Sequence, residues 1–158
     1  LSRQKLPVID REAYAAAEGF ARGAYVLADS AEPPALILIA SGSEVFLALA
    51  AQARLAAEGY AVRVVNMGSW EVFERQERAY RDQVLPPDVT LRVAVEAGAT
   101  FGWERWVGQS GHVVGLDRFG ASAPASDLFS AFGLTAQAVY ERALAVLEGR
   151  VEDGVRNR

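Results

Sequence analysis

The fold is decided by the stretch ALILIASGSE at residues 35–44. Its first six residues form a short, continuous apolar run that follows Pro33-Pro34. Such a run predicts a strand that is covered on both faces, as in a parallel α/β sheet. The polar end of the stretch predicts the start of a long helix over residues 44–58, with Gly59 as its C-cap. Ser41 and Glu44 have the spacing of a capping box, which supports a helix start here.

The segments around this stretch continue an alternation of strands and helices. A β-branched strand at 61–66 closes a strand–helix–strand unit, whose crossover is almost always right-handed. Further strands are expected at 91–96 and 113–115, with an extra edge strand at 25–27, and helices at 70–84, 102–107, 125–132 and 136–148. Thr135 is the expected N-cap of the last helix. This order predicts a three-layer α/β/α sandwich.

Composition excludes several classes of site and function. The chain has 158 residues, with 16 basic and 20 acidic side chains and a net charge of −4. It has no Cys and one His, His112, which removes disulfides, thiol nucleophiles and His-pair metal motifs. The acidic balance argues against a protein that tracks nucleic-acid phosphates. No apolar run approaches the roughly 18 residues of a membrane span, and no signal segment is found, so we expect a cytoplasmic domain.

The turn Ser41-Gly42-Ser43 is the best candidate binding site on physical grounds. Free N–H groups at a helix start beside small residues can hold a phosphate or carboxylate. The glycine fingerprint and the Walker lysine are both missing, however, and Glu44 places a negative charge in the first turn. A capped helix start without a ligand is the favoured alternative.

The segment GQSGH at residues 108–112 places Ser110 near the single imidazole. It lacks the spacing of a nucleophile elbow, and a triad would need a third group that orients the base. We therefore favour a loop histidine over a catalytic His112.

Charges and aromatic residues also follow the later strands. Glu96 ends one strand and Asp117-Arg118 lie beyond the next, where α/β sheets commonly bind ligands. An ion pair of Arg118 with Asp117 or Glu96 is the favoured alternative.

Phe101, Trp103 and Trp106 form a predicted aromatic cluster around Gly102. Residues 103 and 106 share one helical face. A packing anchor or subunit contact is therefore favoured over a platform for nucleobases.

Several short segments, whose order and spacing cover about residues 2–147, read SRQ and LP at 2–7, GAYVL at 23–27 with Asp29, ASGSEV at 40–45, AVRVVNM at 61–67, VLP at 84–86, VAVEAG at 93–98, DRFGASAPA at 117–125 and FGLT at 132–135. Together they resemble the C-terminal region of transketolase, a thiamine-diphosphate enzyme. The resemblance implies a five-stranded mixed sheet in which residues 25–27 form one antiparallel edge strand.

The resemblance also implies an activity for the longer protein. Transketolases move a two-carbon ketol unit between sugar phosphates in the pentose phosphate pathway, and the cofactor acts as the electron sink. Thiamine diphosphate and its Mg²⁺ (or Ca²⁺) bind in the two preceding domains at a subunit interface of a homodimer. This chain is then a third domain that is structural, in contact with the second subunit and open to a regulatory role, and inactive alone.

One residue role is implied by the resemblance. Arg3, in the Ser-Arg-Gln motif, resembles the arginine that binds the substrate phosphate. Residues 1–5 would then be a remnant of the preceding pyrimidine-binding domain, 6–148 the C-terminal domain and 149–158 a polar tail. Because the chain begins at Leu1, we expect a processed chain or an excised fragment.

Two alternatives remain open. The first is the equivalent domain of a related thiamine enzyme, either deoxyxylulose-phosphate synthase or a 2-oxo acid dehydrogenase. The second is an independent module that binds a small anion at residues 41–44. The reading frame upstream of Leu1 would distinguish a fragment of a long enzyme from an independent module.

Overall fold

The computed structural model describes residues 5–150 and is built on one five-stranded sheet. The strand order is β1-β3-β2-β4-β5, with strands β1 (Ala24–Ala28), β2 (Leu36–Ala40), β3 (Val62–Met67), β4 (Arg92–Val95) and β5 (His112–Val114). Strands β2 to β5 are parallel, whereas β1 runs antiparallel to β3. The predicted mixed sheet with one antiparallel edge strand is confirmed.

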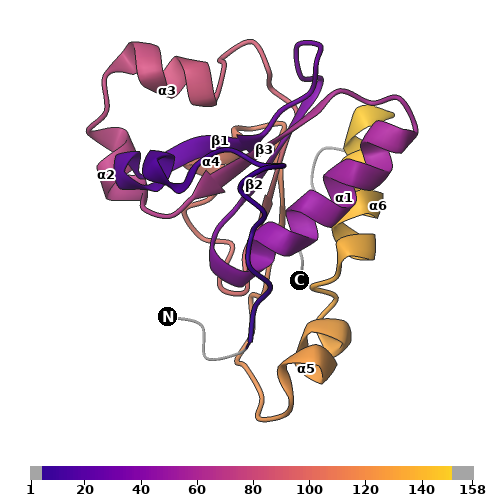
Figure 1. The fold of residues 1–158 in the computed structure, drawn as a ribbon. Helices are drawn as coiled ribbons and strands as arrows, with labels where there is room; N and C mark the ends of the chain where they lie inside the picture. The colour runs from indigo at the N-terminus through magenta and orange to yellow at the C-terminus, as the bar shows by residue number, and fades with distance from the viewer. Residues whose placement is uncertain (1–4, 151–158) are drawn as a thin grey trace.

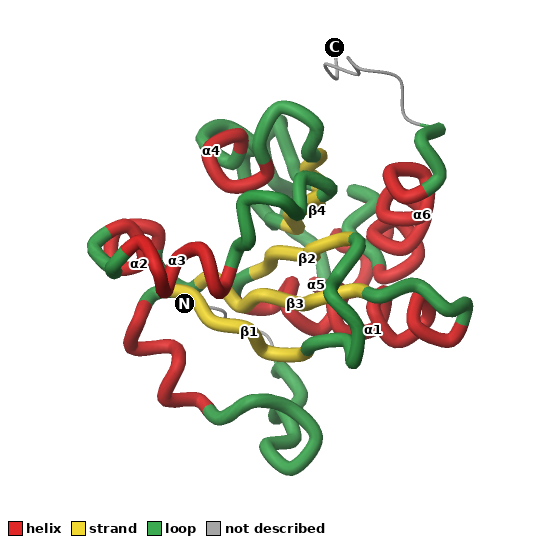
Figure 2. Tube along the Cα trace, turned by 90° about the horizontal axis from the view of Figure 1, so that it is seen from above, coloured by secondary structure: helices red, strands yellow, loops and turns green. Residues whose placement is uncertain are grey.

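Helices cover both faces of this sheet (Figures 1 and 2). One layer holds α1 (Val45–Ala57) and α6 (Ala136–Leu147), and the other holds α2 (Trp70–Glu74), α3 (Arg78–Val84) and α4 (Glu104–Val107). A 3₁₀-helix at Ala17–Arg22 lies against β1, and α5 (Ala125–Ala131) lies away from the sheet in Figure 1. The predicted three-layer sandwich is therefore confirmed. Within residues 5–150, no helix has the length and apolar character needed to cross a membrane.

Strand β2 separates two hydrophobic cores. All five of its residues are buried, as its continuous apolar sequence predicts. Leu36 and Leu38 point toward α1 and α6, whereas Ile37 and Ile39 point toward the other helical layer. This alternation follows from the two-residue period of a strand, and it explains why no polar residue occurs between 36 and 40.

The predicted helix over 70–84 is wrong as a single element, because the chain breaks between α2 and α3. The Gln76 side chain donates a hydrogen bond to the carbonyl of Val72, and the Gln76 backbone N–H bonds instead to Phe73. A side chain therefore takes the place of the backbone donor that would continue the helix. Glu77 is then extended, with ψ of 145°, and begins α3.

The two predicted N-terminal helix caps have different outcomes. The Thr135 hydroxyl accepts a hydrogen bond from the N–H of Ala138, which confirms the cap of α6. The capping box at Ser41 is wrong, because the Ser41 side chain makes no capping hydrogen bond. Residues Gly42–Glu44 form a 3₁₀ turn that buries Glu44, so its carboxylate bonds to the Ser43 hydroxyl instead.

Candidate functional site

The carboxyl ends of β2 and β4 form the switch point of the sheet. From β2 the chain continues through α1 to β3 on one side, while β4 pairs on the other side of β2. In open α/β sheets, ligands commonly bind in the crevice outside such a point. The turn at 41–44 follows β2, and Glu96 follows β4. The structure thus brings together two of the predicted site segments.

The turn after β2 does not favour an anion. Gly42 takes a positive φ of 53°, and Glu44 is 5% exposed. The Glu44 carboxylate therefore lies within the first turn that an anion at Ser41, Gly42 and Ser43 would need. A negative charge there opposes the attraction that a helix start exerts on an anion. The anion site stays a prediction, and the electrostatics of the turn weigh against it.

Glu96 is electrostatically coupled to Glu44. Burial is the main cause that raises the pKa of the Glu96 carboxyl, and the nearby Glu44 carboxylate raises it further. A hydrogen bond from the Trp103 side chain opposes both effects. Neither glutamate belongs to an ion pair within residues 5–150. The switch point is therefore acidic, and Glu96 holds a proton more readily than a solvated glutamate does.

Asp117 ties together the loops that follow β4 and β5. Its carboxylate accepts hydrogen bonds from the backbone N–H of Thr100 at 2.8 Å and from the Thr100 hydroxyl at 2.7 Å. These bonds hold the pKa of Asp117 below its usual value. The predicted ion pair of Arg118 is wrong within the described residues, because Asp117 bonds to Thr100 and the Arg118 guanidinium lies 5.1 Å from the Phe132 ring centre.

The predicted aromatic cluster is confirmed in part. Trp103 and Trp106 are 2% and 7% exposed, and both pack against Trp70, with ring centres 5.0 and 6.3 Å apart. They are packing anchors of the second core. Phe101 is 88% exposed and does not join them, because Gly102, with φ of 89°, turns the chain between Phe101 and Trp103.

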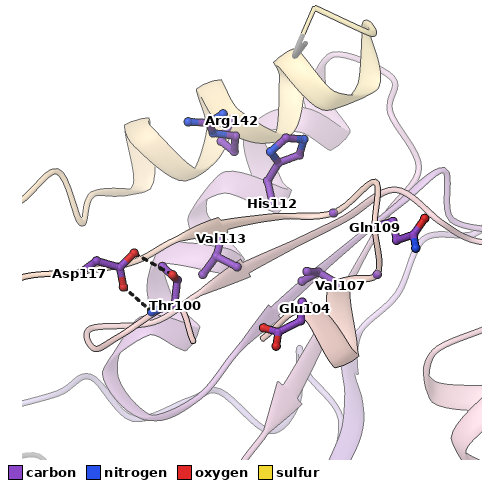
Figure 3. Close-up of a pocket in the computed structure, with 10 residues that line it drawn as sticks. Thr100, Glu104, Val107, Gln109, His112, Val113, Asp117 and Arg142 are labelled. Atoms are coloured by element: carbon purple, nitrogen blue, oxygen red, sulfur yellow. Dashed lines mark hydrogen bonds between the residues drawn. The ribbon is translucent and has the colours of Figure 1, made fainter. Parts of the chain in front are cut away.

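A groove with a volume of about 720 Å³ lies beside β5, the edge strand opposite β1 (Figure 3). Figure 3 shows His112 beside Arg142 of α6, while Glu104 and Val107 of α4 lie on the other side of the strand. The groove thus carries charges of both signs. Sequence reasoning missed Arg142, because no local pattern shows that α6 packs beside β5.

The remaining candidates give no catalytic arrangement. Ser110 is exposed in the loop before β5, and His112 is the first residue of that strand. In the part of the chain that the structure describes, no three His, Asp or Glu side chains converge to hold a metal ion. Arg3 lies outside the described residues.

Comparisons with known proteins agree with this architecture. Residues 23–135 match the model of the transketolase-like TK C-terminal domain. The chain is 48% identical over 150 residues to the transketolase of Halalkalibacterium halodurans, and 47% identical over 148 residues to the chloroplastic transketolase of Spinacia oleracea. The solved transketolase from Leishmania mexicana superposes with a TM-score of 0.77 at 40% identity and covers 86% of this chain.

The matches are unequal in length. The alignments cover 95% and 92% of this chain but only 22% and 20% of the two relatives, and 19% of the Leishmania chain. The chain therefore spans about a fifth of the length of the proteins that it matches.

Proposed function

We propose that this chain completes an enzyme that transfers a two-carbon ketol unit between sugar phosphates, because it belongs to the transketolase family and corresponds to the C-terminal domain of its members. The observation that carries the proposal is a match over nearly the whole chain to about a fifth of each relative. Since the relatives reported above are transketolases, they favour this reading over deoxyxylulose-phosphate synthase and 2-oxo acid dehydrogenases. The domain itself is proposed to be structural and inactive alone.

Thiamine diphosphate and its Mg²⁺ (or Ca²⁺) are proposed to bind in the preceding domains. When bound there, the cofactor supplies the electron sink for the transferred carbons. The described residues do not fit such a group. Glu44 and Glu96 make the switch point acidic, and like charge would repel a diphosphate. The side chains of residues 5–150 also offer no set of three metal ligands.

The part of this chain proposed to touch substrate is Arg3. A guanidinium presents several N–H donors in a plane and stays charged at working pH, which suits a phosphate. Residues 1–5 are proposed to end the preceding domain, 6–148 to form the C-terminal domain, and 149–158 to be a polar tail. We further propose that the full enzyme is a homodimer in the cytoplasm, where a domain without cysteine needs no oxidising environment.

The test uses the full-length protein from the reading frame that contains this chain. It should transfer a ketol unit from a ketose phosphate to an aldose phosphate with thiamine diphosphate and Mg²⁺. Arg3→Ala should raise the KM for phosphorylated substrates roughly ten- to a hundred-fold, as expected for the loss of a charged hydrogen bond of about 1.5–3 kcal/mol. Unphosphorylated substrates should be affected much less.

Arg78→Ala is the matched control, because Arg78 is an exposed arginine on α3 with a side chain 84% accessible. It should leave the kinetics unchanged. No ketol transfer by the full-length protein would contradict the proposed function. An unchanged KM in Arg3→Ala would remove only the role of Arg3.

A further inference from the structure

The exposed large apolar side chains gather at one end of the sheet. Within residues 5–150 they are Leu6, Val8, Phe20, Phe101 and Phe119. Phe101 follows β4 and Phe119 follows β5, both at the carboxyl ends of parallel strands. The Phe20 ring lies at Gly68, which directly follows β3.

The N-terminal segment contributes to the same end. In Figure 1 the described chain begins toward the end of the molecule where α5 lies and runs from there past the start of α1. Val8 on this segment is 93% exposed. None of the five side chains lies in the loops at the amino ends of the strands, which are residues 29–35, 58–61, 85–91 and 108–111.

The two most exposed phenylalanines sit on loops that are held in place. Phe101 and Phe119 are 88% and 97% exposed. Phe101 is adjacent to Thr100, and Phe119 is two residues beyond Asp117, so the hydrogen bonds between Thr100 and Asp117 tie the two loops together. The two phenylalanines therefore lie on loops whose relative positions are fixed by these hydrogen bonds.

The chain between β5 and α5 extends this surface. Residues 117–127 are all exposed, and α5 buries none of its residues. The exposed run includes Phe119, Ala121, Ala123 and Pro124. Exposed apolar side chains that gather at one end of a soluble domain are typical of an interaction site.

We propose that the carboxyl end of the sheet, with Phe101, Phe119 and residues 120–127, docks onto the preceding part of the same polypeptide. The occupant follows from length and position, since about four-fifths of each relative lies outside the matched region and the described chain begins toward this end. This inference rests on the proposed function only in requiring a longer polypeptide. The contact is apolar and centred on the two phenylalanines.

Thiol labelling of the full-length protein tests the contact. The 158 residues contain no cysteine, so Phe119→Cys and Phe101→Cys each add one thiol to this domain, and the unsubstituted protein gives the background. The control is Thr90→Cys, an exposed position beside the amino end of β4. Fluorescein maleimide should label the thiols at 101 and 119 at least ten-fold more slowly than the thiol at 90. All three should react equally in denaturant.

Each outcome is decisive. Fast labelling at 119 in native protein that still transfers ketol units would overturn the docking and leave the proposed function standing. Protection at 119 in a protein that transfers no ketol units would support the docking and overturn the proposed function. Protection that disappears when the protein is diluted to monomers would assign the surface to a second copy and overturn the proposed occupant. Hydrogen exchange at residues 117–121 of the unsubstituted protein tests the same contact without a variant, and slow exchange is expected.

Discussion

The two ends of the sheet are completed in different ways. At the amino end, Arg92 donates hydrogen bonds to four backbone carbonyls, those of Leu85, Pro86, Val89 and Trp106. Arg63 bonds to the carbonyls of Gln83 and Val84 and pairs with Asp29 at 2.8 Å. At the carboxyl end, Glu96 feels the charge of Glu44, neither belongs to an ion pair among the described residues, and two phenylalanines are exposed.

The amino end therefore contributes mainly to the stability of the domain, whereas the carboxyl end offers a surface for interaction. The amino end is closed by the chain's own arginines, which donate hydrogen bonds to backbone carbonyls there. The carboxyl end keeps its apolar side chains in water and its carboxylates together. Substitutions at the two ends should therefore act on different properties.

The largest effect is expected at the amino end. Arg92→Met keeps an apolar stem of similar length but removes the hydrogen bonds that the guanidinium donates to the four carbonyls. Hydrogen bonds from a charged group are worth about 1.5–3 kcal/mol each and are not additive, so the free energy of unfolding should fall by about 3 kcal/mol. Urea unfolding of the variant measures this, with Arg78→Met as the exposed control. A loss no greater than that of the control would break the distinction between the two ends.

A smaller loss is expected where the two carboxyl-end loops join. Thr100→Val removes one hydroxyl bond to Asp117 and keeps the backbone bond, so the loss should be about a third of the Arg92→Met effect. The pKa of Asp117 is lowered in the folded state, so its bonds contribute above its unfolded pKa and are lost as pH falls through the folded value. The stability difference between variant and parent should therefore shrink in acid. A difference that stays constant with pH would show that Asp117 does not hold the loops.

Glu96→Gln should have a smaller effect of the opposite sign. The pKa of Glu96 is raised, so the folded state binds its proton more tightly, and stability falls as pH rises from the unfolded pKa through the folded value. Glutamine removes this loss, so the variant should melt higher than the parent at neutral pH, with the advantage fading in acid. Thermal melts from pH 4 to pH 8 follow the change. Glu104→Gln, on an exposed residue of α4, should leave the melting temperature unaltered.

The smallest effect is expected at the most exposed aromatic residue. Phe119→Ser should change the free energy of unfolding of this chain by less than about 0.5 kcal/mol, since the side chain is 97% exposed. The same urea measurement applies. A loss of 2 kcal/mol would mean that Phe119 packs within the domain, and the contrast between the two ends would then fail.

Sequence patterns were sufficient for the layers of the fold. The apolar run at 36–40 is buried on both faces because helices cover both sides of a parallel sheet, so period and composition alone identified it. Thr135 was identifiable because its cap needs only local geometry. The antiparallel β1 came from the resemblance, since three apolar residues carry no direction.

Other features depend on tertiary contacts that local patterns do not encode. The break between α2 and α3 is set by one side-chain bond of Gln76 to the backbone. Glu44 has the right spacing for a cap, yet the 3₁₀ turn buries it beside Ser43. Arg118 has Asp117 beside it in sequence, but the Asp117 carboxylate is already bonded to Thr100. The acidic character of the carboxyl end was also missed, because it depends on Glu44 and Glu96 coming together from the ends of two separate strands.

The position of β1 has a consequence for the order of folding. β1 pairs only with β3, with Ala24 opposite Met67, and β3 lies between two strands that are consecutive in the chain. Strand β1 therefore has no partner until β2, α1 and β3 have assembled. The long stretch of chain between β1 and β3 must fold back before the two strands can pair. Tyr25 and Leu27, which are buried in the finished domain, stay in water until then. On the ribosome, β1 emerges more than thirty residues ahead of the strand that receives it, so the first of these five strands to be made must wait for the third.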